Sequence, residues 1–128
     1  MKKHSWKYYA RYAKKVNKKL DYKKTKKARK FKKKYGFDCT ETWNLDTETA
    51  LFLLVRIAYL RDNSPCIPVS YALNYAENAG SEWYKTLSKI IKGLYKYVKT
   101  CYADRPVNET KWKKTKELIS ENFEELWY

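Results

Sequence analysis

The residues best able to do chemistry in this chain are cations and aromatic side chains, which meet at one place in the sequence. Three lysines at 32–34 stand directly before the segment 36–46, in which polar and aromatic residues alternate. Lysine and arginine pair with phosphate oxygens, and aromatic rings stack on nucleobases. One interpretation is therefore a site for a small anionic ligand. Its candidate ligand-binding residues are Lys33, Lys34, Tyr35, Trp43, Asp46, Arg56 and Tyr59.

A structural interpretation of the same segment is equally open. Asp38 followed three residues later by Glu41 predicts a capping box, in which the Asp38 carboxylate accepts from amides of the first helical turn. Trp43 would then anchor the start of a helix in the core. The two interpretations are compatible with each other.

Arg56 interrupts an otherwise apolar stretch at 50–60. A buried or interfacial arginine needs an anion near it. That anion is either a ligand phosphate or an acid of the chain, for which Asp46 and Glu48 are the candidates.

Several kinds of active site are excluded by composition. The only histidine, His4, cannot form a catalytic triad or a multi-histidine metal site. The three glycines are isolated, so neither common glycine-rich phosphate loop can form. The three cysteines are widely spaced, which argues against a disulfide framework or zinc ribbon and fits a reducing cytosol. We expect no enzyme activity, no cofactor and no metal.

Positive charge is concentrated at the start of the chain. Residues 1–35 contain 17 Lys and Arg and one acid, whereas residues 36–128 are almost neutral, in a chain of formal charge +15. Such an arm favours a polyanion or a phosphate-bearing ligand as partner. Lysine dominates over arginine, which favours diffuse attraction over base-specific recognition. Nonspecific nucleic-acid binding through the arm is therefore the alternative function. The structural interpretation of the same lysines is a solvated helix face without a ligand.

The arm has a helical pattern. Apolar residues recur every three or four positions, which predicts an amphipathic helix. A weaker stripe follows, with fraying expected near 21–25. The first stripe comprises Trp6, Tyr9, Ala13, Val16 and Leu20, and the second Ala28, Phe31 and Tyr35.

The remainder of the chain predicts further helices. We expect one from about 40 to 61, with a second start at Asn44 or Asp46 as an option, ended by Asn63–Pro65. Residues 69–73 form a short helix or an irregular loop. A long helix follows, with Ser81 as N-cap. Its apolar seam comprises Tyr84, Leu87, Ile91, Leu94, Val98 and Cys101, widened by Trp83, Ile90 and Tyr97.

The broad seam suits burial against several helices or against another subunit. Asn108 or Thr110 caps the last helix, whose apolar side comprises Leu118, Ile119, Phe123, Leu126 and Trp127. The predicted fold class is all-α, a small bundle of three to four main helices. We divide this single domain into a helical arm, 1–35, and a body for ligand binding and oligomerisation, 36–128. No stretch is long and apolar enough to cross a membrane, so we expect a soluble cytoplasmic protein.

The motif at 36–46 also resembles a family of small phage-encoded proteins. These carry a Gly-aromatic pair and a Trp-x-Leu-Asp motif after a basic stretch, then an apolar helix. The likeness covers 32–128 discontinuously, and departs at Val55, where the family usually has proline, and in the heavier arm. The matching residues are Gly36-Phe37, Trp43-Asn44-Leu45-Asp46, Ala50, Leu53–Ile57, Glu82-Trp83, Leu87, Ile91 and Phe123–Trp127.

This family resembles the anti-CBASS nucleotide sponges, phage proteins that sequester the cyclic dinucleotides used by bacteria as immune alarm signals. The resemblance implies a helical homo-tetramer that binds 3′,3′-cyclic GMP–AMP without cleaving it. It also implies action in the cytoplasm of the host bacterium. The ligand residues proposed above come from their chemistry and not from the family.

Overall fold

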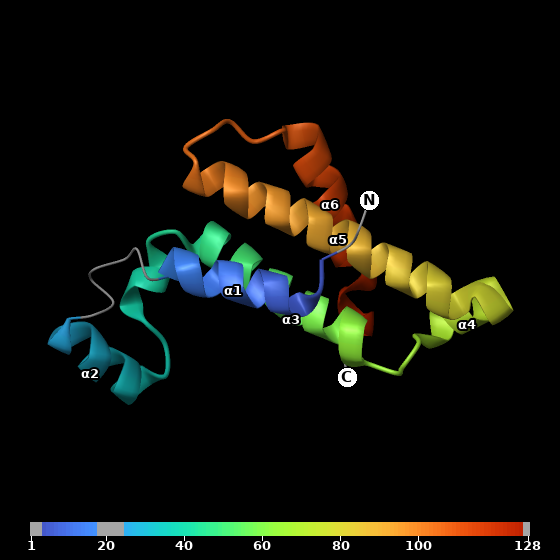
Figure 1. The fold of residues 1–128 in the computed structure, drawn as a ribbon, viewed down its shortest axis with the longest axis horizontal. Coiled ribbons are helices and arrows are strands. Elements are labelled where there is room, and N and C mark those ends of the chain that lie inside the picture. Colours follow the sequence, from blue (N-terminus) through green and yellow to red (C-terminus); the bar gives the residue numbers. More distant parts are fainter. Residues whose placement is uncertain (1–3, 18–24, 127–128) are drawn as a thin grey trace.

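The chain folds into helices joined by short turns, as seen in the computed structural model (Figure 1), which describes residues 4–17 and 25–126. Across these two ranges there is no strand, which confirms the all-α prediction. The elements are α1 (Trp6–Asn17), α2 (Lys26–Tyr35), the 3₁₀ turn η2 (Cys39–Thr42), α3 (Leu45–Asn63), α4 (Val69–Tyr75), η3 (Ala76–Asn78), α5 (Ala79–Tyr102), α6 (Glu109–Asn122) and η4 (Phe123–Glu125). None of the described helices is long and apolar enough to span a membrane.

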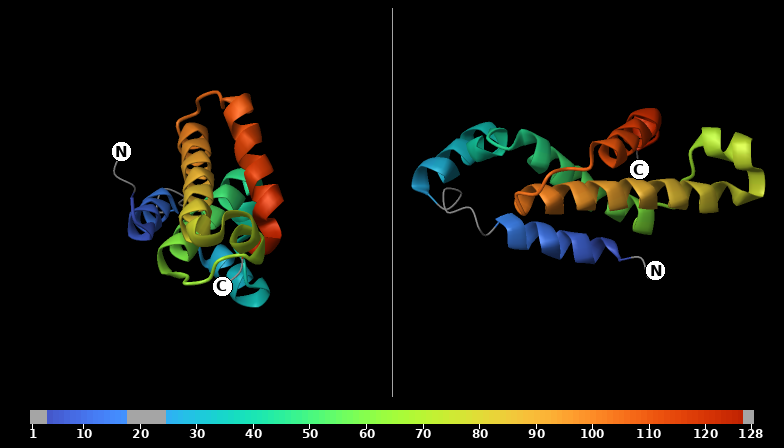
Figure 2. Two further views of the ribbon diagram at one scale, coloured as in Figure 1. Left: turned by 90° about the vertical axis from the view of Figure 1, so that its right-hand side faces the viewer. Right: turned by 90° about the horizontal axis from the view of Figure 1, so that it is seen from above.

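The centre of the fold is the pair α3 and α5. Helix α1 packs against α3, and α4 and α6 pack against α5, so the long helix is covered on several sides (Figures 1 and 2). Burial of apolar surface between these helices is the main source of stability. The largest fully buried side chains are Leu54, Leu87, Ile90, Ile91, Leu94 and Val98.

The predicted seam of α5 is confirmed in its middle, whereas its first and last members are not buried. Its four central members, from Leu87 to Val98, are buried, whereas Tyr84 is exposed and Cys101 is half-buried. The prediction that Ser81 caps this helix is wrong. The 3₁₀ turn η3 runs directly into α5, and the Ala79 N–H already bonds to the carbonyl of Ala76. The helix therefore begins two residues before Ser81.

The segment 38–63 divides in the way that a second helix start predicts. Asp38 accepts hydrogen bonds from the Thr40 N–H at 2.9 Å and from the Thr40 hydroxyl at 2.7 Å. It therefore caps η2, and α3 begins separately after Asn44. Trp43 is 66% exposed, so its assignment as a core anchor is wrong. The break between η2 and α3 turns its side chain away from the core.

The last helix is capped by Asn108, whose side chain accepts from the Lys111 N–H at 3.1 Å. Leu118, Ile119 and Leu126 pack against the core as predicted. Phe123 does not, because it is 64% exposed where the α-helix gives way to η4. Trp127 lies outside the described residues.

The two helices of the basic arm have different surroundings. In α1 the apolar stripe faces the body, with Tyr9 and Val16 buried and Trp6 and Ala13 packed against the core. Leu20 and nearly all of the segment where fraying is expected lie outside the described residues. Helix α2 lies at one end of the long axis of the molecule and α4 at the other (Figures 1 and 2).

Candidate functional site

The residues proposed from the sequence are spread over two helices and the turn between them. Lys33, Lys34 and Tyr35 are exposed at the end of α2, and Trp43 is exposed after η2. Tyr59 is exposed on α3, where its ring meets Trp6 edge-on at 5.0 Å between ring centroids. The structure does not gather these side chains around one cavity.

Arg56 lines a cavity, a hollow of about 570 Å³ bounded by α1, α2, η2 and α3. Its guanidinium lies 3.5 Å from the centroid of the Phe52 ring and donates to the Phe52 carbonyl at 3.3 Å. Three acids, Asp38, Glu41 and Glu48, line the same hollow. Carboxylates repel phosphate, so this hollow is poorly suited to a doubly charged anion.

Asp46 instead forms a hydrogen bond with the phenol of Tyr97. The Tyr97 hydroxyl donates to the Asp46 carboxylate at 2.5 Å and so ties the start of α3 to α5. This bond lowers the pKa of Asp46, assisted by the N–H of Thr47, and raises the pKa of Tyr97. The Tyr97 ring also stacks on Trp112 of α6 at 3.9 Å.

A better candidate for an anion site is the groove where α1 lies beside α5. We call it the α1–α5 groove, and its volume is about 770 Å³. None of the described residues that line it is acidic, and five of them carry a positive charge at neutral pH. The lining residues are His4, Tyr9, Arg61, Ser88, Lys92, Tyr95, Lys96, Lys99, Thr100, Ala103 and Arg105.

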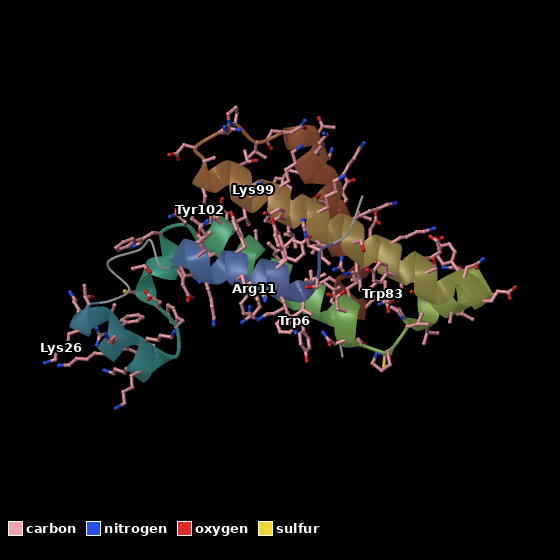
Figure 3. All side chains as sticks on the ribbon, in the orientation of Figure 1. Trp6, Arg11, Lys26, Trp83, Lys99 and Tyr102 are labelled. Atoms are coloured by element: carbon pink, nitrogen blue, oxygen red, sulfur yellow. The ribbon has the colours of Figure 1, made fainter. Side chains whose placement is uncertain are left out.

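The cations of the groove come mainly from one face of α5. Lys92, Lys96 and Lys99 are spaced by four and three residues, so they share that face, and Arg105 follows the end of the helix. All four side chains are exposed at the groove's edge. Figure 3 shows Lys99 near the end of α5, on the same part of the helix as Tyr102.

Sequence reasoning missed this face, although a signal was present. Lysines recur at 85, 89, 92, 96 and 99, with the spacing of the apolar seam but on the other side of the helix. That the face lies beside α1 depends on tertiary packing.

Tyrosines form the apolar wall of the groove. The ring of Tyr95 lies 5.3 Å from that of Tyr9 and 5.2 Å from that of Tyr12, measured between centroids. Its hydroxyl shares a hydrogen bond of 2.9 Å with Tyr8. Burial, followed by this bond, raises the pKa of Tyr95, so the phenol stays protonated and adds no negative charge. The Lys99 ammonium lies 5.2 Å from the Tyr95 centroid, within cation–π range.

Arg61, at the inner side of the groove, is the buried arginine of α3. It is only 8% exposed, and its guanidinium donates to Asp62 at 2.9 Å and to the His4 carbonyl at 2.6 Å. Asp62 in turn accepts from the N–H of Trp6 at 2.7 Å. The pair therefore holds the start of α1 against the end of α3. Asp62 balances the charge of Arg61, so the lysines and Arg105 supply the groove's excess charge.

The four excess cations and the protonated tyrosines of this lining can hold phosphates and planar rings. Among the residues that the structure describes, no group of His, Cys, Asp and Glu could hold a metal ion. Neither protein-family models nor curated proteins nor solved structures yield a match to this chain.

Proposed function

We propose that the protein binds a cyclic dinucleotide immune signal, such as 3′,3′-cyclic GMP–AMP, in the α1–α5 groove and sequesters it without cleaving it. The observation that carries the proposal is the lining of this groove, whose described residues include lysines and tyrosines but no acid. A cyclic dinucleotide presents two phosphates and two planar bases. Charge-assisted hydrogen bonds suit the phosphates, and aromatic rings suit the bases.

The size of the groove agrees with such a ligand. Its volume of about 770 Å³ falls within the range of roughly 300 to 1,000 Å³ common for small-molecule sites. The resemblance to the anti-CBASS sponges supports the same ligand class. The resemblance also carries the expectation of a homo-tetramer, which light scattering on the purified protein measures directly.

Sequestration works by stoichiometry. A phage protein of this kind inhibits CBASS defence by lowering the free signal in the host bacterial cytoplasm below the level that its receptor needs. A Kd of about 1 nM corresponds to about −12 kcal/mol. Contacts to both phosphates are needed for that affinity, and for this reason we place the ligand beside the lysine face of α5.

The test measures binding of 3′,3′-cyclic GMP–AMP to the full chain by calorimetry and by the shift in thermal unfolding. Ligand at 100 times Kd stabilises the folded state by about 2.7 kcal/mol. We expect the double variant Lys96→Glu with Lys99→Glu to lose both the heat of binding and the thermal stabilisation by the ligand. The matched control, Lys113→Glu with Lys114→Glu on α6, changes the net charge equally and leaves binding intact. Chromatography of the released ligand should recover it uncleaved.

Arg56→Ala tests the competing location at segment 36–46. With the ligand in the groove, this variant binds like the unchanged protein. Loss of binding in Arg56→Ala, with the Lys96 and Lys99 variant unaffected, would move the site to that segment. Absence of any response in the unchanged protein would overturn the proposed function.

A further inference from the structure

Helix α2 is the most strongly charged element of the molecule and has no part in the groove. Seven of its ten residues are Lys or Arg and none is acidic. All seven side chains are exposed. They are Lys26, Lys27, Arg29, Lys30, Lys32, Lys33 and Lys34.

Repulsion between these cations opposes formation of the helix. Like charges four residues apart, as at Lys26 and Lys30, destabilise a helix. Two caps oppose this effect: the Thr25 hydroxyl accepts from the Ala28 N–H at 3.2 Å, and Gly36 closes the other end with φ of 82°. A bound polyanion would reduce this repulsion. The caps favour the helical conformation in which the cations are available to the polyanion.

The apolar side of α2 is turned toward its own chain. Ala28 is 1% exposed, and the half-buried Phe31 meets Phe37 edge-on at 5.3 Å between centroids. Helix α2 packs against η2 and lies at the end of the long axis, with Lys26 on the outer side (Figure 3). Its cations are therefore exposed, whereas Ala28 and Phe31 are turned toward the chain.

We propose that α2 binds the phosphate backbone of nucleic acid without sequence preference, as a second site independent of the nucleotide groove. A ten-residue helix is about 15 Å long, enough to lie along several phosphates. Lysine is a point charge and does not provide the bidentate geometry with which arginine recognises a base. A membrane surface fits less well, because a helix that lies on a membrane inserts a broad apolar face, whereas α2 has only three apolar residues, of which Tyr35 alone is exposed.

The structure also indicates which part of the basic arm would bind nucleic acid. The sequence places the charge on an arm of 35 residues, but α1 uses its apolar stripe to pack on the body, whereas α2 extends from it. We therefore expect the two helices to contribute unequally. Nothing in this inference depends on the proposed function, because the groove residues and the α2 residues are different.

The test measures binding of the full chain to labelled 30-base-pair duplex DNA, to single-stranded DNA, to duplex RNA, and to vesicles rich in phosphatidylserine. Two variants carry the same charge change: Lys26→Glu, Lys30→Glu and Lys33→Glu on α2, and Lys7→Glu, Lys14→Glu and Lys15→Glu on α1. Circular dichroism confirms that both remain helical.

We expect the α2 variant to lose at least about tenfold in affinity for nucleic acid and to show a shallower salt dependence, because fewer counterions are released. The α1 variant should stay within about threefold of the unchanged protein. Equal losses in both variants would overturn the proposal by showing a general effect of net charge. Binding to vesicles alone would also overturn it and assign α2 to a membrane surface. The α2 variant should still bind cyclic dinucleotide, so the two proposals fail separately.

Discussion

Gly93 allows α5 and α6 to approach closely. A Cβ atom at this position would lie 2.0 Å from Oγ1 and 2.8 Å from Cβ of the buried Thr115. The Thr115 Cβ cannot move without its backbone, so Gly93→Ala must push the two helices apart. We expect this variant to lose about 1–3 kcal/mol of unfolding free energy, as overpacked cores do. Urea denaturation measures it.

Gly80→Ala is the control for that prediction in the same helix. Its Cβ would meet only the Cδ1 atom of Ile67, at 3.3 Å, the end of an exposed side chain that can move. Alanine also favours the helix over glycine by about 1 kcal/mol. Equal destabilisation by both substitutions would show that the α5–α6 approach has no special role.

The bond between Tyr97 and Asp46 predicts a pH dependence of stability. Because the folded-state pKa of Asp46 is lowered, its contribution is present above the unfolded pKa and is lost as pH falls through the folded value. Tyr97→Phe should therefore destabilise the protein at pH 7 by about 1 kcal/mol, since Asp46 is exposed to solvent. At pH 2 to 3 the difference from the unchanged protein should shrink. A constant difference between these pH values would contradict the assignment.

The two arginines of α3 show what residue-level reasoning could reach. Arg61 follows Leu54, Ile57 and Ala58 at helical spacing, and all four side chains are buried in the structure. Arg56 falls on the other face and is exposed. The sequence was ambiguous because α3 has apolar residues on nearly all sides, so its apolar pattern did not show which arginine faced the core.

At the scale of elements, the end of α5 predicts a stabilising substitution. The Arg105 N–H bonds to the Thr100 carbonyl and the Asp104 N–H to the Cys101 carbonyl, the pattern of a Schellman motif. The left-handed position of this motif usually holds glycine, but here Asp104 adopts φ of 51°. Asp104→Gly should therefore raise the unfolding free energy by about 1 kcal/mol, measured by urea denaturation.

Asp104→Ala is the matched control, because alanine removes the same carboxylate but disfavours positive φ. It should leave the protein less stable than Asp104→Gly. Equal effects of the two substitutions would assign the change to the lost charge and not to the backbone.

Elements were predictable where a local signal defines them. Asp38 and Asn108 each cap the turn that follows them, and the middle of the α5 seam is buried as its spacing requires. The start of α5 was not predictable from Ser81, because a 3₁₀ turn replaced the side-chain cap. The groove was beyond sequence reasoning for a different reason: it depends on tertiary packing, in which Arg61 and Asp62 hold the start of α1 against the end of α3.

At the scale of the whole molecule, charge and shape distinguish the two proposed anion sites. The α2 end carries seven exposed cations along one helix. The groove combines four excess cations with tyrosine rings and lies between helices of the body. Long-range attraction by the total charge of +15 brings any anion near, but salt screens it over about 10 Å at 0.1 M. Local contacts then decide which anion stays bound.

This difference predicts different salt responses for the two proposed ligands. If α2 neutralises about four phosphates of a duplex, the logarithmic slope is about −0.9 per phosphate, so tripling NaCl weakens binding roughly 50-fold. A cyclic dinucleotide carries two charges and also stacks on tyrosine, and its affinity should fall less than about tenfold. Titrations at 0.1 and 0.3 M NaCl, with duplex DNA and with cyclic dinucleotide, measure both. Equal salt dependence would mean that the groove holds its ligand by diffuse charge alone, and its tyrosines would then have no part in recognition.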